Sequence, residues 1–163
     1  MSLGTGLGAG IILNGRLRRG KRNSVGEIGY SVFDKSFQTS KSKAGWAESR
    51  ISLNALYEQR NFSVSNGIND IPADNLILLT EYVASNMALC IVNLSMQIDL
   101  GLVVIGGITA ETLGEPLIRA VQKYVSKLCL LDTEVQFQKC QEPGVAGAAS
   151  IATSIKLDEM LAD

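Results

Sequence analysis

Residues 3–20 read LGTGLGAGIILNGRLRRG, in which glycine occupies every second position from Gly4 to Gly10 before an apolar run that ends at Asn14-Gly15. Glycine lacks a Cβ, so such a backbone can turn sharply and approach a ligand closely. Its N–H groups can form an anion-binding concavity, to which the Thr5 hydroxyl adds a donor. The stretch predicts either a phosphate loop between two strands or an ordinary glycine-rich hairpin, and taken alone it does not distinguish them.

Length and composition fit one compact domain over residues 1–163, with a formal net charge of −1. The near-neutral charge argues against a dedicated nucleic-acid surface. Polar residues interrupt every long apolar run, so we expect no membrane span. The three cysteines, Cys90, Cys129 and Cys140, lack CxxC spacing. They are expected to be reduced, buried thiols of a cytoplasmic protein.

Hydrophobic periodicity gives the order of the elements. Alternation and turn residues predict strands first, with Asn14-Gly15 as a hairpin turn and 35–45 as a polar loop. Helical spacing then alternates with short apolar runs, and the helix over 74–98 is apolar on every side near its middle, as a buried central helix would be. The predicted strands are 1–5, 8–14, 28–34, 100–105 and 135–137, and the predicted helices are 48–60, 74–98, 110–128 and 145–155. This order predicts an α/β domain of the ribonuclease-H-like class with a mixed five-stranded sheet, and 100–105 reads as a buried parallel strand.

Three further motifs follow the glycine stretch: GEIG at 26–29, GWAES at 45–49 and VVIGGITAE at 103–111. In this order they resemble the ROK family (repressors, open reading frames and kinases), which has the actin/hexokinase-type ATPase fold. The resemblance runs over nearly the whole chain but covers only the second half of a ROK protein. It therefore implies a C-terminal lobe. The family's DxGxT motif and its catalytic Asp would belong to an N-terminal lobe that is absent, so no residue of this chain is expected to be the catalytic base.

The resemblance implies ATP as a cofactor, with Mg²⁺, in the complete protein. Small residues suit close approach of a nucleotide, although a tight turn between strand and helix is the plain structural alternative for Gly106-Gly107. The family usually has three consecutive glycines there, and this chain has two. The residues that match the family's ATP contacts are Gly4, Thr5 and Gly6 for phosphate and Gly106, Gly107 and Ile108 for adenosine.

The same resemblance implies a sugar site that contains Glu27, Tyr30 and Glu48. Ionised carboxylates accept hydrogen bonds only, which suits them to sugar hydroxyls. Both glutamates would orient the substrate rather than act as the base. The structural alternatives are a solvated carboxylate at Glu27 and a packing role for Tyr30.

The family often has a zinc-binding histidine where this chain has Tyr30, followed by a CxCGxxGC stretch. Here the polar loop 35–45 replaces that stretch, Trp46 stands near its last cysteine, and the chain contains no histidine. A closed structural zinc site needs four Cys or His ligands. The sequence therefore predicts a zinc-free member.

Two further segments allow a structural or a functional interpretation. The basic run Arg16, Arg18, Arg19, Lys21 and Arg22 is either a solvated arm or a contact for an anionic ligand. The Gly-Ala-rich segment 143–149 resembles the start of the family's final helix, where small residues would allow close packing.

Two functions are expected from the resemblance. The first is an ATP-dependent kinase of a hexose-type sugar. The second is the sugar-sensing domain of a transcriptional repressor, whose DNA-reading part would lie elsewhere. A degenerate member without catalysis is a third possibility. We also expect a homodimer, for which the predicted helices 48–60 and 110–128 offer apolar stripes, and no direct nucleic-acid binding by this domain.

Overall fold

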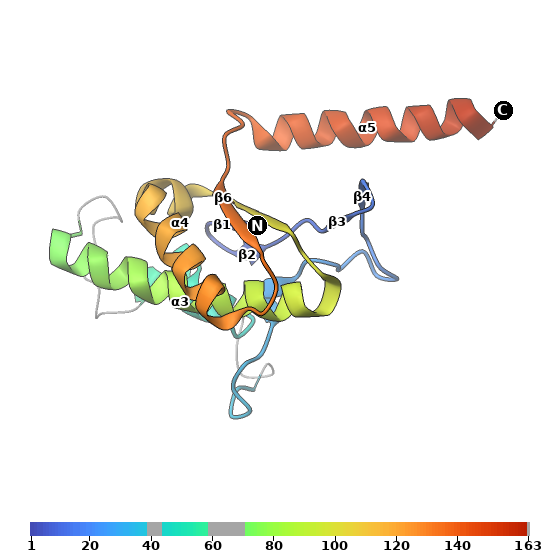
Figure 1. Cartoon of the computed structure of the whole chain (residues 1–163). Coiled ribbons are helices and arrows are strands. Elements are labelled where there is room, and N and C mark those ends of the chain that lie inside the picture. The colour runs from blue at the N-terminus through green and yellow to red at the C-terminus, as the bar shows by residue number, and fades with distance from the viewer. Residues whose placement is uncertain (39–43, 59–70, 163) are drawn as a thin grey trace.

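The computed structural model describes residues 1–38, 44–58 and 71–162. Short strands from the two halves of the chain lie side by side near its middle (Figure 1). Two long helices pack beneath them, and the last helix runs away from this body on the opposite side (Figure 1). The class is mixed α/β, as predicted.

The first four strands form two antiparallel pairs. Strand β1 (Ser2–Leu3) pairs with β2 (Leu7–Gly8), and β3 (Ile12–Leu13) pairs with β4 (Arg16–Leu17). Asn14 and Gly15 join β3 to β4 with φ angles of 54° and 71°. Two consecutive positive φ angles are typical of the turn that matches the twist of a two-residue hairpin. The predicted hairpin is confirmed.

Strands β5 (Leu102–Ile105) and β6 (Glu134–Phe137) form a parallel pair. A parallel bridge between Ser2 and Gly106 links this pair to β1. The Leu3 N–H donates to the Gly106 carbonyl at 2.8 Å, and the Gly106 N–H donates to the Met1 carbonyl at 3.0 Å. Among the described residues the strands thus form three two-stranded ladders, two of which (β1–β2 and β5–β6) are linked by this bridge, rather than the single five-stranded sheet that we predicted.

The predicted strand over 28–34 is wrong. Residues Ile28–Tyr30 form a 3₁₀ helix, η1. Gly26, at φ +98°, lies so close to the Ala9 carbonyl that a Cβ would be 1.7 Å from its oxygen. The Ile28 N–H then donates back to the Gly26 carbonyl at 2.7 Å. This local turn uses the donor that a strand would have offered to its neighbour, so the ladder ends there.

The predicted helix over 48–60 is divided in two: α1 (Glu48–Ile51) and α2 (Leu53–Glu58). Ser52 separates them with ψ at 154°, and its hydroxyl accepts the Ala55 N–H at 3.2 Å, as an N-cap does. Residues 59–60 lie outside the described part of the chain.

The core lies between α3 (Ala73–Ile98) and α4 (Ile108–Leu128), which pack against each other beneath the strands. By length and composition α3 could cross a membrane, but buried side chains such as Leu79, Met87 and Ile91 place it in the core. The prediction of a buried central helix is confirmed. Within α4, Gly114 has a φ of 60° and a ψ of −152°, which breaks the regular helix two residues before Pro116.

Two expectations about apolar surface are wrong. The stripe Leu113, Leu117, Val121 and Val125 of α4 is buried in this chain's own core, so it offers no face for a second copy. In β5, Val103 and Ile105 are buried, but Leu102 is 49% and Val104 41% exposed. The two helices cover one face of this strand, and Leu102 and Val104 lie on the other face.

Helix α5 (Pro143–Ala162) includes the predicted 145–155 helix and extends beyond it. Every one of its described side chains is exposed. A Cβ added at Gly144 or Gly147 would meet no atom within 4 Å. The close packing expected of this Gly-Ala-rich segment is therefore not present.

The cysteines also differ from expectation. Cys90 is buried in α3, Cys129 is partly buried, and Cys140 is exposed. All three are free thiols, as expected of a reduced protein. Burial raises the pKa of Cys90 to about 11.

Candidate functional site

Glu48 lies where the glycine stretch and the GEIG turn meet. It occupies the first turn of α1, and its Oε2 accepts the Leu7 N–H at 3.1 Å. A Cβ added at either Gly6 or Gly29 would be 3.1 Å from that same oxygen. Two predicted motifs, far apart in the sequence, therefore enclose one carboxylate from two sides.

Glu27 directly precedes η1, and Tyr30 is the last residue of η1. Gly29 lies between them in sequence and touches the Glu48 side chain, so the segment that carries both residues abuts α1. Both side chains are exposed, Tyr30 to 50%. The structure thus brings the three predicted sugar contacts into one neighbourhood, with two of them accessible to a ligand.

The turn Gly4-Thr5-Gly6 joins β1 to β2. The Gly4 N–H donates to the Gly6 carbonyl at 3.0 Å, and the Gly4 carbonyl accepts the Leu53 N–H at 2.7 Å. Thr5 is exposed. The stretch is a glycine-rich hairpin in geometry, and the start of α2 holds its turn in place.

Gly106 and Gly107 follow β5 and lead into α4. At Gly107, φ is +98°, and a Cβ would be 2.5 Å from the Leu3 carbonyl oxygen. The Cβ position of Gly4 lies 3.6 Å from Cγ2 of Ile108. The six predicted ATP contacts therefore lie on two neighbouring segments, and at Gly107 only a glycine allows this close approach.

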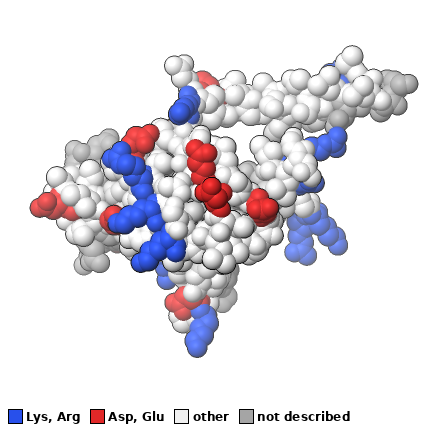
Figure 2. Space-filling model, in the orientation of Figure 1, with Lys and Arg blue, Asp and Glu red and all other residues white. Residues whose placement is uncertain are grey.

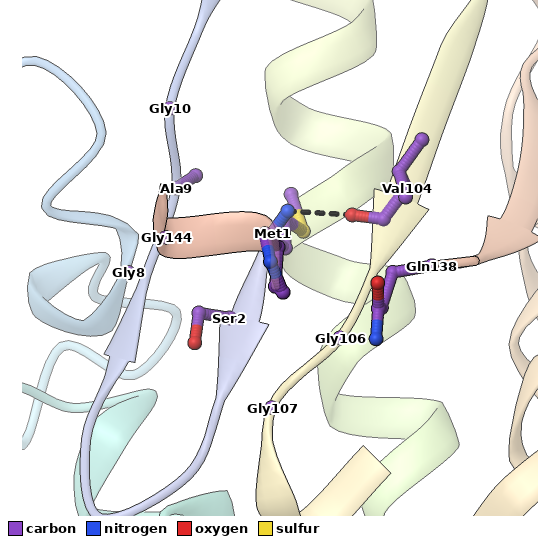
Figure 3. A pocket seen from close by; sticks show the side chains of 11 residues that line it. Met1, Ser2, Gly8, Ala9, Gly10, Val104, Gly106, Gly107, Gln138 and Gly144 are labelled. Atoms are coloured by element: carbon purple, nitrogen blue, oxygen red, sulfur yellow. Dashed lines mark hydrogen bonds between the residues drawn. The ribbon is translucent and has the colours of Figure 1, made fainter. Parts of the chain in front are cut away.

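A surface cavity of about 430 Å³ opens beside these glycines (Figure 3). It includes Gly106 and Gly107 but not Gly4, Thr5, Gly6 or Ile108, so this cavity contains only two of the six predicted ATP contacts. Strands β1, β2 and β5 and the start of α5 supply its walls. The lining residues are Met1, Ser2, Gly8, Ala9, Gly10, Val104, Gly106, Gly107, Gln138, Pro143 and Gly144.

Gln138 is a cavity residue that sequence reasoning missed. It follows β6, and a Cβ at Gly106 would be 2.6 Å from its Cγ. Its Oε1 is buried with no hydrogen-bond partner among the described residues. A buried amide oxygen beside a glycine cradle fits a site for a ligand that carries N–H donors, as a purine base does. Its position after a parallel strand, next to the end of β5, could have indicated it.

The remaining candidates can be placed as follows. Within the described ranges, no group of three or more Cys, Asp or Glu side chains lies close enough to hold a metal ion. The basic run lies on the β3–β4 hairpin and the segment after it, with every residue exposed. Basic side chains gather in this region beneath α5 (Figure 2).

Comparison with known proteins adds a family. A family model described as the ROK family matches residues 1–155. An uncharacterised protein from Clostridium perfringens is 28% identical over 154 residues, which are 91% of this chain and 52% of that protein. The N-acetylmannosamine kinase of Vibrio vulnificus is 29% identical over 135 residues, 78% of this chain and 45% of the kinase. The chain thus spans about half the length of the curated relatives it matches.

Solved structures show the fold. The ROK hexokinase from Thermus thermophilus superposes with a TM-score of 0.74 at 21% identity, over 95% of this chain and 57% of the other. A ROK glucokinase from Streptomyces griseus, in complex with glucose and AMPPNP, gives 0.72 at 20% identity over 92% and 58%. A ROK transcriptional regulator homologous to the Escherichia coli MLC protein gives 0.68 at 18% identity over 86% and 41%. These likenesses assign the actin/hexokinase-like ATPase fold.

Proposed function

The chain belongs to the ROK family, and from this premise we propose that it forms the C-terminal lobe of an ATP-dependent kinase of hexose-type sugars, active in the cytoplasm. The observation that carries the proposal is the meeting of the glycine turn, the GEIG turn and α1 at the Glu48 carboxylate. Family membership alone would also fit a regulator. An intact carboxylate site beside an intact glycine turn supports a catalyst.

In this proposal Glu27 and Glu48 accept hydrogen bonds from sugar hydroxyls, and Tyr30 contributes its phenolic O–H. Glu48 is held through the Leu7 N–H and is only partly exposed, so its position is set before the sugar arrives. Preorganised acceptors orient a substrate at lower cost than mobile ones. The two carboxylates choose and hold the sugar, and neither removes the proton of the reacting hydroxyl.

The nucleotide end of the site would consist of Gly4, Thr5 and Gly6 toward the phosphates and Gly106, Gly107 and Ile108 toward the adenosine. The close approach of Gly107 to Leu3 and of Gly4 to Ile108 supports placing one ligand across both segments. ATP would supply the phosphoryl group, and Mg²⁺ would neutralise its charge. Gln138 would accept a hydrogen bond from the base through its unpartnered oxygen.

In the proposed reaction the general base would come from outside this chain. In the proposal, an N-terminal lobe supplies that base, an Asp, and closes the other side of the cleft. Alignment of two reactants is worth about 7–11 kcal/mol of barrier. One lobe alone would lack both that alignment and the base, so we expect the isolated chain to show no sugar kinase activity and to bind ATP weakly at best.

The alternative is the effector domain of a sugar-responsive repressor. The likeness to a ROK transcriptional regulator favours it as a second candidate. A repressor would need the sugar site without turnover, and its DNA contacts would lie outside this domain.

The experiment compares the complete protein with this chain. ATP consumption is measured with glucose and with N-acetylmannosamine, and DNA binding is measured on fragments from the upstream region of its own gene. Sugar-dependent ATP consumption by the complete protein alone supports the proposal. Sugar-sensitive DNA binding without ATP consumption would replace it by the repressor. Turnover by this chain alone would disprove the two-lobe division of the site.

A further inference from the structure

Trp46 is the best-packed aromatic side chain near the candidate sugar site, and neither proposed function uses it. It is 5% exposed and lies two residues before Glu48. Its ring meets that of Phe33 edge-on, with centroids 5.1 Å apart and planes at 82°. The Arg50 guanidinium carbon lies 3.7 Å from its ring centroid. One indole therefore contacts the segment after η1 on one side and α1 on the other.

The Trp46 backbone holds the first turn of α1 as well. Its carbonyl accepts the Ser49 hydroxyl at 2.8 Å and Arg50 Nη1 at 3.3 Å. Arg50 thus binds Trp46 twice, through the ring and through the carbonyl. Glu48 lies within the turn that these contacts hold.

The partner segment is fixed from the same place. A Cβ at Gly45 would be 2.2 Å from the Gly29 carbonyl oxygen and 2.4 Å from the Tyr30 Cα. Hydrogen bonds from the Ser36 backbone and hydroxyl lower the pKa of Asp34, and the Arg50 charge adds a smaller effect in the same direction. Arg50 therefore acts across the gap between α1 and the residues that follow η1.

We propose that Trp46 is a positioning residue for carbohydrate: with Phe33 and Arg50 it forms a clamp that locks Glu48 against the segment that carries Glu27 and Tyr30. This clamp (Phe33, Trp46 and Arg50) stabilises the relative placement of the two segments rather than touching the sugar. The role in sugar binding rests on the proposed function. The clamp itself is a set of contacts within this chain.

The first test is amide hydrogen exchange on this chain, followed by mass spectrometry. Arg50→Gln removes the cation and weakens its contacts with the Trp46 ring and carbonyl. Because Arg50 is partly exposed, the fold should survive this substitution. We expect exchange to rise about tenfold over both 27–33 and 46–51 while α3 and α4 keep wild-type rates, because local opening costs less than global unfolding. Trp46→Ala should raise the exchange rates of the same two segments further. Trp46→Phe should retain part of the wild-type protection.

Lys123→Gln is the matched control. Lys123 lies over the Tyr124 ring at 5.9 Å, a cation–aromatic pair on α4 away from the clamp. It should leave both segments unchanged. The inference is wrong if Arg50→Gln raises the exchange rate of 46–51 but not that of 27–33. It is also wrong if exchange rises uniformly through α3 and α4, since that pattern indicates general destabilisation.

The second test is a double-mutant cycle on sugar KM in the complete protein, with N-acetylmannosamine and glucose as probes. If Trp46 acts through Glu48, Trp46→Phe should raise the sugar KM about tenfold in wild type and much less in a Glu48→Gln background, with the KM for ATP unchanged. Equal effects in both backgrounds would overturn the positioning role. If the complete protein phosphorylates neither sugar, the proposed function fails, and the exchange experiment decides the clamp separately.

Discussion

Oε2 of Glu48 lies 3.1 Å from the backbone nitrogen of Leu7, two groups separated by 41 positions in the sequence. This hydrogen bond joins the first helix to the end of the glycine turn. It uses one acceptor site of one carboxylate oxygen, and an ionised carboxylate offers about four. A single side chain can therefore brace the turn and still accept hydrogen bonds from a ligand.

Glu48→Gln is expected to separate these two roles. The amide oxygen can still accept the Leu7 N–H, so the free energy of unfolding should change by less than about 1 kcal/mol. Sugar affinity in the complete protein should fall about tenfold, because charge-assisted hydrogen bonds become neutral ones. Thermal unfolding and sugar titration measure the two effects, and Glu111→Gln, on the exposed face of α4, serves as the control. Unchanged sugar affinity would remove Glu48 from the site.

Gly45→Ala is expected to destabilise the chain by at least about 2 kcal/mol, since the new Cβ would lie 2.2 Å from the Gly29 carbonyl oxygen. Gly101→Ala is the matched control, because nothing lies within 4 Å of its Cβ position. That substitution should stay within about 0.5 kcal/mol of wild type. Urea unfolding monitored by circular dichroism compares the two. Equal stability of both variants would contradict the tight packing of Gly45 on η1.

The thiols should react in the order of their exposure. At pH 8, Cys140 is expected to react promptly with a disulfide reagent, whereas Cys90, with a pKa of about 11, is roughly one part in a thousand thiolate even when reached. Because folding raises this pKa above its ordinary value of 9.0, the contribution of Cys90 to stability is complete below about pH 9 and is lost as pH rises toward 11. Thiol counting before and after denaturation checks the order. Modification of Cys90 at the rate of Cys140 would contradict it.

Zinc is expected to be absent from the purified chain. The sequence has no histidine and three widely spaced cysteines, too few for a four-ligand structural site. Elemental analysis should therefore find well below one zinc per chain. A stoichiometric content that survives dialysis against a chelator would overturn this prediction.

Self-association is expected to involve α5 rather than α4, since the apolar stripe of α4 is buried. Val145, Ile151, Ile155 and Met160 on α5 are all exposed. We expect a dimer in sedimentation velocity at tens of micromolar, a range typical of weak interfaces. The double substitution Ile151→Asp and Ile155→Asp should shift it toward monomer. A wild-type monomer at that concentration would contradict the prediction.

The elements that sequence reasoning predicted well are those whose signal lies within the element itself. The apolar periodicity of α3 and α4 extends over 26 and 21 residues, and Asn14-Gly15 specifies its own turn. The failures depend on contacts distant in sequence. Nothing local in 28–34 reveals that Gly26 packs on Ala9, and nothing in 143–162 reveals that the helix stays uncovered.

The candidate site divides in the same way. Family motifs supplied Glu27, Glu48 and the glycines, and the structure placed the two glycine segments together. Gln138 belongs to no motif and became visible only because β6 ends beside Gly106. The role of Trp46 was hidden for a similar reason, since Phe33 and Arg50 reach it from opposite directions along the chain.

Trp46 is the only tryptophan of this chain, and it is shielded from water between an aromatic edge and a guanidinium group. The intrinsic fluorescence of the unlabelled chain therefore comes mainly from Trp46. Its emission should be blue-shifted and poorly quenched by iodide while the clamp is intact. The emission should shift to the red when the clamp opens, even where circular dichroism still reports folded helices. The emission wavelength of Trp46 therefore reports local unfolding around this side chain, and it can be followed in a fluorimeter without a label.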